Sequence, residues 1–245
     1  RLRGDAMAMI FQEPMTSLNP AYTIGSQMAE VRVRHMGGSK AQALDRAAML
    51  LGRVGITAPG MRLAQYPHQL SGGLRQRVMI AMALMCEPRL LIADEPTTAL
   101  DVTVQAQILR LLLELQGELG LGILLITHDL GIVARMAHRV SVMYAGRVVE
   151  SGPAAELFGT PTHPYTHGLL ECVPVPGKVA RGAPLGSIPG TVPKIGPGYV
   201  GCAFRERCSQ AMAVCATAVP EQEREPGHRY ECHLPAEWTA QVAAA

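Results

Sequence analysis

The stretch that decides the fold is Leu90-Leu91-Ile92-Ala93-Asp94-Glu95-Pro96, in which four apolar residues run into two adjacent carboxylates. An unbroken apolar run of this length is typical of a strand buried on both faces of a parallel sheet. Ligands of such sheets bind beyond the carboxyl ends of the strands. There Asp94 could hold Mg²⁺ and Glu95 could polarise an attacking water. Paired acids can also simply mark the place where a strand meets solvent.

Further apolar runs lie on both sides of this stretch. One covers residues 6–11, and another covers residues 123–126, after a helical segment over residues 102–118. Strands that alternate with helices in this way predict a parallel α/β sheet. Helical periodicity predicts two more helices over residues 24–36 and 40–54, and residues 140–150 read as an edge hairpin turning at Ala145-Gly146.

Polar residues follow the predicted strands. Gln12 comes after the first run, and His128 comes after the run that ends at Ile126. A histidine at the carboxyl end of a strand can reach a terminal phosphate, although a lone histidine is more often structural. Asp101 has its own plain interpretation, as the N-cap of the helix that follows it.

A second motif is Leu70-Ser71-Gly72-Gly73-Leu74-Arg75-Gln76-Arg77, which leads into an apolar helix over residues 78–86. Ser71 is a natural N-cap, and Gly72 and Gly73 let a phosphate approach backbone N–H groups at the positive end of the helix dipole. The motif therefore indicates an anion site. An ordinary capped helix is the alternative interpretation.

Composition limits the classes of function that remain. The 245 residues are 48% apolar, which suits one domain with a smaller appendage, and 22 basic residues nearly balance 20 acidic ones, so nothing indicates a nucleic-acid partner. The apolar stretches fall short of the roughly 18 residues that cross a bilayer, so another subunit would have to do the spanning. Six cysteines without an export signal favour reduced thiols or metal ligands in the cytoplasm.

In order and spacing, these motifs resemble those of the ATP-binding cassette ATPases. The Q-loop, signature, Walker B, D-loop and switch histidine of that family match Gln12, residues 70–76, residues 90–95, residues 100–101 and His128. The resemblance implies a P-loop-type α/β fold with a helical subdomain. It also implies that Asp94 and Gln12 support Mg²⁺, that Glu95 is the general base, and that Gln12 and His128 sense the γ-phosphate of ATP.

The same resemblance implies further nucleotide contacts, by Ser71, Gly72, Gly73, Gln76 and Asp101. In that family the signature residues clasp the nucleotide held by an opposing subunit. A homologous ATPase subunit is therefore an expected partner.

One motif of that family is absent from the sequence. Gly-x-x-x-x-Gly-Lys-[Ser/Thr], the Walker A loop, does not occur, because Gly177-Lys178 is followed by Val179. The family places this loop upstream of Gln12, and the chain opens Arg1-Leu2-Arg3 without a start methionine or signal peptide, so we expect an N-terminally truncated chain. Two hypotheses follow: an ATP-hydrolysing subunit whose upstream piece is missing, or a non-catalytic or regulatory cassette that supplies only its signature to a partner.

Two further stretches narrow the resemblance. Residues 11–20 and Thr162-His163-Pro164-Tyr165-Thr166 are similar to the dipeptide and oligopeptide importer subfamily, although His163-Pro164-Tyr165 alone would be an ordinary turn. The resemblance implies import of peptides across the cytoplasmic membrane, with nickel or another solute as the alternative. It also implies permease subunits and an extracytoplasmic peptide-binding protein as partners, and a place on the cytoplasmic face of the membrane.

Four cysteines near the C-terminal end of the sequence have the spacing Cys202-x5-Cys208-x6-Cys215-x16-Cys232. Zinc ribbons favour Cys-x-x-Cys knuckles, which are absent, whereas irregular spacing is compatible with a four-cysteine iron–sulfur cluster. His228 and His233 leave room for a mixed zinc site, and inert or partly paired thiols are the third possibility. We expect a [4Fe-4S] cluster, or docking on the ATPase domain, to stabilise a module too small for a core of its own.

Composition also predicts the boundaries of the domains. The expected parts are a partial ATPase domain over 1–152 with a helical subdomain at about 13–88, a Pro/Gly-rich linker over 153–200, the four-cysteine module over 201–235 and a tail over 236–245. A short helix is expected within the linker at residues 165–172.

Overall fold

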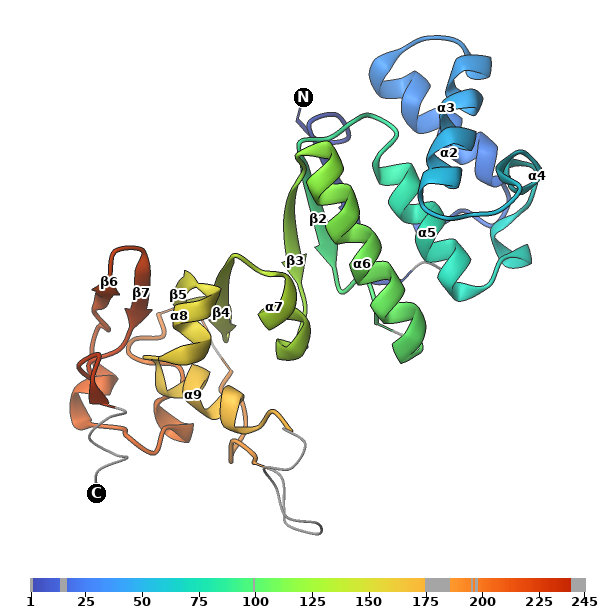
Figure 1. Cartoon of the computed structure of the whole chain (residues 1–245). Coiled ribbons are helices and arrows are strands. Elements are labelled where there is room, and N and C mark those ends of the chain that lie inside the picture. The colour runs from blue at the N-terminus through green and yellow to red at the C-terminus, as the bar shows by residue number, and fades with distance from the viewer. Residues whose placement is uncertain are drawn as a thin grey trace. The chain divides into compact units, whose positions relative to one another are not determined.

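Figure 1 shows the computed structural model, which describes residues 2–13, 17–98, 100–174, 186–194, 196 and 198–238. The chain divides into two compact units, Arg1–His128 and Asp129–Ala245. Residues 175–185 of the predicted linker, residues 239–245 of the predicted tail and residues 14–16 of the importer motif lie outside the described residues. None of the helices in the described ranges has both the length and the hydropathy of a membrane span.

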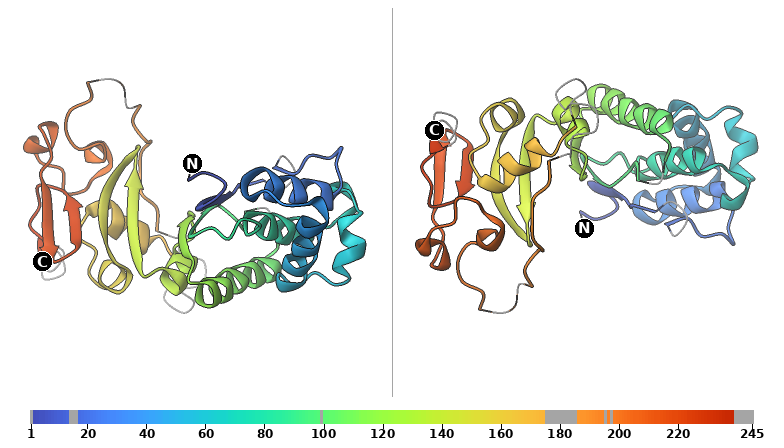
Figure 2. Two further views of the ribbon diagram at one scale, coloured as in Figure 1. Left: turned by 90° about the horizontal axis from the view of Figure 1, so that it is seen from above. Right: turned by 90° about the horizontal axis from the view of Figure 1, so that it is seen from below.

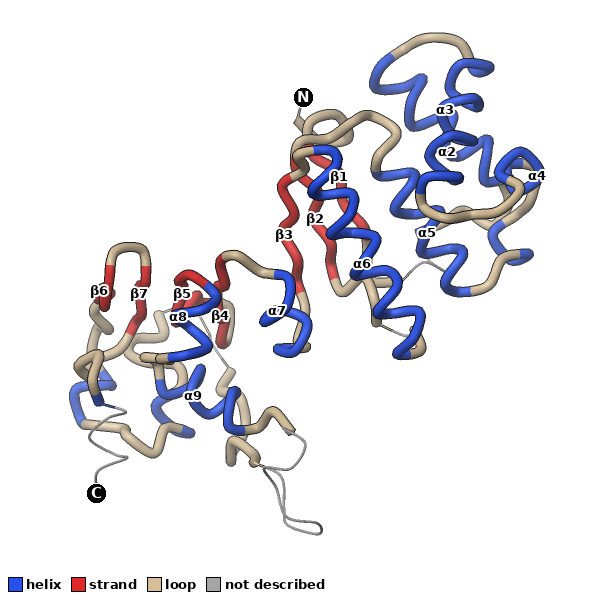
Figure 3. Tube along the Cα trace, viewed as in Figure 1, coloured by secondary structure: helices blue, strands red, loops and turns tan. Residues whose placement is uncertain are grey.

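The described part of the first unit contains a parallel sheet in the order β1-β2-β3. The strands are β1 (Met7–Ile10), β2 (Leu90–Asp94) and β3 (Gly122–Ile126), drawn in red in Figure 3. Ile10 pairs with Ala93, and Ala93 pairs with Leu125, so the carboxyl ends of all three strands meet at one edge. The predicted strands and their parallel arrangement are confirmed.

The prediction that an unbroken apolar run marks a strand buried on both faces is wrong for β3. Leu124 is 51% exposed and Ile126 is 45% exposed, while Ile123 and Leu125 are half-buried. Successive side chains of a strand point to opposite faces, and within the described residues the face that carries Leu124 and Ile126 is only about half covered. An apolar run alone does not tell a central strand from a strand at the margin of a sheet.

Helices make up the rest of the first unit. They are α2 (Ile24–Met36), α3 (Lys40–Arg53), α4 (Pro59–Leu63), η1 (Pro67–Gln69), α5 (Gly72–Ala83) and α6 (Val102–Leu119). Side-chain oxygens cap several of them, because Thr23, Ser39, Ser71 and Asp101 each accept a backbone N–H of the first turn. The core between the helices contains Met28, Leu50, Ile80 and Leu112, all fully buried.

The second unit is built on an antiparallel sheet in the order β4-β5-β7-β6. Its elements are α7 (Leu130–Met136), β4 (Arg139–Tyr144), β5 (Arg147–Pro153), α8 (Ala154–Gly159), α9 (Pro164–Glu171), η2 (Arg205–Arg207), η3 (Ala213–Ala216), β6 (Glu221–Glu225) and β7 (His228–Glu231). Positive φ angles at Ala145 (+48°) and Gly146 (+82°) make the tight turn between β4 and β5. The predicted hairpin and the predicted short helix are confirmed, but the hairpin belongs to this separate antiparallel sheet, in which β5 lies between β4 and β7 and, of the two hairpin strands, only β4 is at the edge.

Residues 201–235 share a core with the β4–β5 hairpin. Phe204 packs edge-on against Tyr144, with ring centroids 5.3 Å apart, in a cluster that also contains Val142 and Leu157. β7 pairs with β5 at Glu150, which Figure 2 shows as the red strands beside the yellow-green ones. The cysteine-containing stretch is therefore docked on the hairpin, while the boundaries at 152 and 200 stay predictions.

Candidate active site and thiol pocket

Glu95 lies at the carboxyl edge of the parallel sheet, directly after β2. Its backbone N–H donates a hydrogen bond to the carbonyl of Ile126, at the end of β3, over 2.9 Å. Its φ angle is +43°, in the left-handed region, where a non-glycine residue costs roughly 1–2 kcal/mol. The sheet thus holds Glu95 in a strained conformation of the kind that clusters at functional sites.

Three side chains bind the carboxylate of Glu95. Gln12 donates from Nε2 to Oε2 over 2.7 Å, and Thr98 donates from Oγ1 to the same oxygen over 2.8 Å. The Nδ1 atom of His128 lies 3.1 Å from the other oxygen, Oε1. Gln12 follows β1 and His128 follows β3, so the three polar residues predicted at the strand ends meet at one edge.

These contacts lower the pKa of Glu95. The hydrogen bond with His128 has the largest effect, and the one from Thr98 comes second. An ionised carboxylate can only accept, so His128 donates from a protonated Nδ1. Because Oε2 already has two donors and Oε1 has only His128, Oε1 keeps a lone pair with which it can accept a proton from water.

Asp94 and Gln12 offer oxygen atoms that suit Mg²⁺. Asp94 ends β2 and is half-buried, and Gln12 keeps its amide Oε1 free of Glu95 because only Nε2 donates there. No group of three or more His, Cys, Asp or Glu side chains in the described ranges could hold a metal ion by itself. The assignment of Asp94 and Gln12 to Mg²⁺ therefore stays a prediction, in which the ion would take most of its ligands from phosphate and water.

The signature motif forms the capped start of α5. Leu74 donates its backbone N–H to Ser71 Oγ over 3.4 Å, which confirms the predicted N-cap. A Cβ atom on Gly73 would come within 2.9 Å of Val104 Cγ1 on α6, whereas one on Gly72 would meet nothing closer than 3.7 Å. Close packing of α5 on α6 accounts for Gly73, and Gly72 leaves backbone N–H groups open to a ligand.

Gln76 and Asp101, the two other expected nucleotide contacts, lie in different surroundings from each other. Gln76 is 1% exposed, and its Nε2 has no hydrogen-bond partner in the described part of the chain, so this placement does not support a contact with nucleotide. Gln76 is one of the buried residues of α5, together with Val78 and Ile80, whereas Gly72 at the start of the helix is exposed. Asp101 caps α6 by accepting the N–H of Val104 over 2.9 Å, as its plain interpretation predicts, and it stays exposed.

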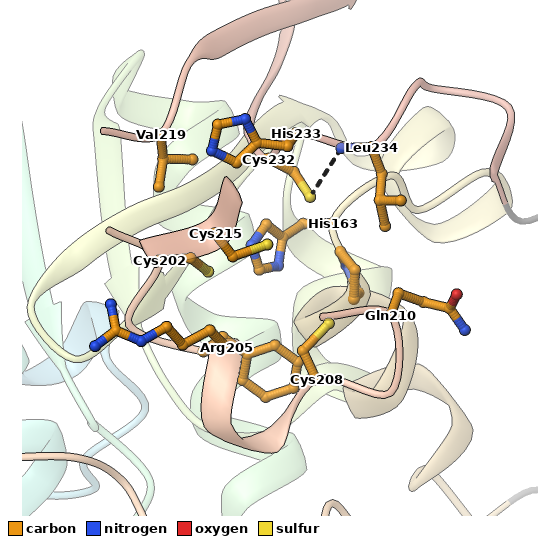
Figure 4. Close-up of a pocket in the computed structure, with 12 residues that line it drawn as sticks. His163, Cys202, Arg205, Cys208, Gln210, Cys215, Val219, Cys232, His233 and Leu234 are labelled. Atoms are coloured by element: carbon orange, nitrogen blue, oxygen red, sulfur yellow. Dashed lines mark hydrogen bonds between the residues drawn. The ribbon is translucent and has the colours of Figure 1, made fainter. Parts of the chain in front are cut away.

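The four C-terminal cysteines line one pocket in the second unit. Figure 4 shows Cys202, Cys208, Cys215 and Cys232 around this pocket, to which His163 and His233 also contribute. All four are free thiols. Among the described residues, no group of three or more His, Cys, Asp or Glu side chains is placed so that it could hold a metal ion, so the metal centre stays a prediction.

His228 does not line the thiol pocket. It is buried, and its Nε2 lies 2.8 Å from Oε1 of Glu150. The hypothesis of a mixed zinc site that includes His228 is therefore not supported, whereas His233 is placed at the pocket wall.

The surroundings of the thiols are suited to negatively charged sulfur. Backbone N–H groups near in sequence point at all four sulfurs: those of Phe204 and Arg205 at Cys202, Gln210 at Cys208, Met212 at Cys215 and Leu234 at Cys232. Burial nevertheless raises the pKa of Cys202 and Cys208, and raises that of Cys232 to about 11, with the charges of neighbouring cysteines adding to the effect. Burial therefore favours the thiol form of Cys202, Cys208 and Cys232, and a bound positive centre would favour their thiolates.

Two residues with clear roles were missed by sequence reasoning. Thr98 reaches Glu95 Oε2 because a tight turn follows the strand, and its position three residues after Glu95 was the available signal. Glu150 is buried and accepts backbone N–H groups from Thr162 and His163. Nothing in the sequence around Glu150 indicates this role, because its partners are 12 and 13 residues away in an irregular segment.

Comparison with known proteins defines the class. The ABC transporter family matches residues 1–98, and the family described as oligopeptide/dipeptide transporter, C-terminal region, matches residues 149–215. A solved structure of cbiO1 from Clostridium perfringens, part of the ABC transporter complex cbiONQ, is 34% identical with a TM-score of 0.55, over 63% of this chain and 59% of that one. The dimeric ATP-binding cassette MJ0796 with ADP and Pi is 29% identical with a TM-score of 0.54, over 62% of this chain and 64% of that one.

Curated relatives narrow the class to one group. A putative peptide import ATP-binding protein of Brucella melitensis is 58% identical over 90% of this chain and 66% of its own length. The dipeptide transport ATP-binding protein DppD of Bacillus subtilis is 51% identical over 95% of this chain and 69% of its own length. The oligopeptide transport ATP-binding protein OppD of Salmonella typhimurium is 50% identical over 96% of this chain and 70% of its own length. The chain belongs to this family of peptide-transport ATP-binding proteins, and it spans about two thirds of the length of the relatives that it matches.

Proposed function

We propose that this chain is part of an ATPase subunit that uses ATP and Mg²⁺ to power the import of dipeptides or oligopeptides. The observation that carries the proposal is the single carboxylate of Glu95, held by Gln12 from β1 and by His128 from β3. Relatives named for peptide import, 50% and 58% identical to this chain, support the class of transported solute.

Each residue of the site has its own role in the hydrolysis of ATP. Glu95 accepts a proton from the attacking water through Oε1, and its lowered pKa keeps it ionised for that step. Gln12 and His128 sense the γ-phosphate, because each is hydrogen-bonded to the carboxylate that activates the water attacking this phosphate. Asp94 and Gln12 would hold Mg²⁺, which would supply positive charge against the charge that develops on the phosphate.

The site is completed by other subunits. Ser71, Gly72 and Gly73 present the capped start of α5 to a nucleotide held on a homologous ATPase subunit, and Asp101 lies at the start of α6 near Val104. The dimeric state described for MJ0796 and the complex described for cbiO1 support a pair of cassettes that works with transmembrane permease subunits. We place the assembly on the cytoplasmic face of the membrane, fed by an extracytoplasmic peptide-binding protein.

A metal centre in the thiol pocket is a second part of the proposal. Four free thiols face one pocket, and each receives a backbone N–H, which supports four thiolate ligands. We place a [4Fe-4S] cluster ahead of one zinc ion because the four cysteines have irregular spacing without a Cys-x-x-Cys knuckle. Protein purified without oxygen should contain about four irons per chain and lose them in Cys208→Ser. Zinc in place of iron, or no metal, would contradict the cluster.

Transport tests the main proposal. Vesicles that hold the full-length complex, loaded with ATP on the cytoplasmic side, should accumulate a labelled dipeptide only when ATP is hydrolysable. Uptake of Ni²⁺ without uptake of peptide would contradict peptides as the transported solute and would identify nickel in their place. Peptide uptake that continues when this subunit carries Glu95→Gln together with His128→Ala would favour a cassette that only supplies its signature.

A further inference from the structure

The motif His163-Pro164-Tyr165 begins α9, and nothing in the proposed ATPase chemistry uses it. Pro164 occupies the first helical position, where its missing N–H costs nothing. His163 is the N-cap and is 1% exposed. A fully buried polar side chain at the entrance of a helix needs partners for its nitrogen atoms.

The buried carboxylate of Glu150 fixes the backbone at the start of this motif. Glu150 accepts the backbone N–H of Thr162 over 2.7 Å and that of His163 over 2.9 Å, and it also binds His228. Charge-assisted bonds of this kind are short and directional. Because Glu150 lies on β5, the sheet of the second unit determines where the His163 ring points.

The hydrogen bonds of His163 determine which nitrogen carries its proton. The N–H of Tyr165 donates to Nδ1 over 3.0 Å, so Nδ1 is the acceptor nitrogen and the proton of the neutral ring is on Nε2. Nε2 is buried and has no hydrogen-bond partner among the described residues. His163 also lines the thiol pocket, and Figure 4 shows its ring among the cysteine side chains.

We propose that His163 donates a hydrogen bond from Nε2–H to a sulfur atom of a metal centre bound in the thiol pocket, an inference that rests on the proposed function for that centre. His163 is a donor and not a metal ligand, because ligation through Nε2 needs the lone pair that the proton occupies. The sulfur is the Sγ of a cysteine thiolate or a sulfide of a bound cluster. His163 is thus a positioning residue that stabilises charge on sulfur.

A donor to sulfur has a measurable electronic effect. Hydrogen bonds to the sulfurs of an iron–sulfur centre stabilise its more negative, reduced state and raise its reduction potential.

The variant His163→Asn separates this effect from helix capping. The asparagine Oδ1 can still accept the N–H of Tyr165, since Asn is a strong N-cap, but the shorter side chain has no donor where Nε2 was. The matched control is His167→Asn, the same change on α9 at a residue that packs on Trp238 and does not line the pocket. Both variants are made in the full-length protein, and circular dichroism checks that they fold.

In anaerobically prepared protein we expect His163→Asn to keep its iron and to shift the reduction potential to a more negative value, by about 59 mV for each tenfold change in the one-electron equilibrium. His167→Asn should leave both the iron content and the reduction potential unchanged.

The two proposals fail in different ways. Wild-type protein without metal would overturn the metal centre and the hydrogen bond together. An unchanged reduction potential in iron-loaded His163→Asn would overturn the hydrogen bond alone.

Discussion

The Nδ1 atom of His128 lies 3.1 Å from Oε1 of Glu95, although the two residues are 33 positions apart in the chain. Each follows a strand of the same parallel sheet, so the sheet register brings them together. Gln12 occupies the other carboxylate oxygen at 2.7 Å. One carboxylate therefore connects the side chains that follow β1 and β3, and a change at either side chain alters the charge and freedom of Glu95.

His128→Ala should raise the pKa of Glu95 toward its ordinary value of 4.5, because the bond to His128 is the largest cause of the lowered pKa. A carboxyl whose folded-state pKa is lowered contributes stability above its unfolded pKa, and this contribution is lost as the pH falls through the folded pKa. The variant should therefore lose less stability on acidification than the wild type. Carbon-13 NMR titration of the Glu95 carboxyl measures the shift, with His68→Ala as control. An unchanged titration would remove the His128 bond from the account.

The two signature glycines should respond differently to the same change. Gly73→Ala should lower the free energy of unfolding by about 1–3 kcal/mol, because the new Cβ would meet Val104 Cγ1 at 2.9 Å. Gly72→Ala should be neutral or stabilising by up to about 1 kcal/mol, since its Cβ meets nothing closer than 3.7 Å and alanine favours a helix. Urea unfolding of both variants decides the question. Equal losses in both would mean that α5 does not pack on α6 as described.

Glu150→Ala should destabilise the second unit by about 3–5 kcal/mol, because it leaves the N–H groups of Thr162 and His163 and the ring of His228 without their buried partner. Denaturant unfolding followed by the fluorescence of Trp238, a residue of this unit, measures the loss. The control is Glu171→Ala, at an exposed residue of α9 whose change should stay within about 0.5 kcal/mol. Similar small losses in both would show that Glu150 does not hold the motif.

Local patterns in the sequence predicted much of this structure. The helix over residues 24–36 agrees with α2 at both ends, because Thr23 caps its start and Gly37, with a φ of +71°, ends it. The strand ends that carry Gln12, Glu95 and His128 followed from apolar runs and from the rule that ligands bind at the carboxyl edge. Capping by Ser71 and Asp101 is equally local.

Long-range features could not be predicted in this way. The strand β6 reads Glu-Gln-Glu-Arg-Glu, without an apolar alternation, and it forms only because β7 offers a partner. Glu150 and His228 lie 78 positions apart, so no local pattern joins them. The exposed face of β3 depends on what packs against the sheet, and the burial of Gln76 depends on which face of α5 points inward.

Glu95→Gln tests the central claim most directly. In the full-length complex, the amide keeps the shape of the side chain but cannot accept the proton of water, so ATP should still bind while hydrolysis at this site falls by about 10²–10⁴-fold. The matched control is Glu114→Gln, on the exposed surface of α6, which should hydrolyse ATP at the wild-type rate. The measurement is single-turnover hydrolysis of labelled ATP by the wild type and both variants. A Glu95→Gln complex that turns over ATP at the wild-type rate at both nucleotide sites would contradict the account.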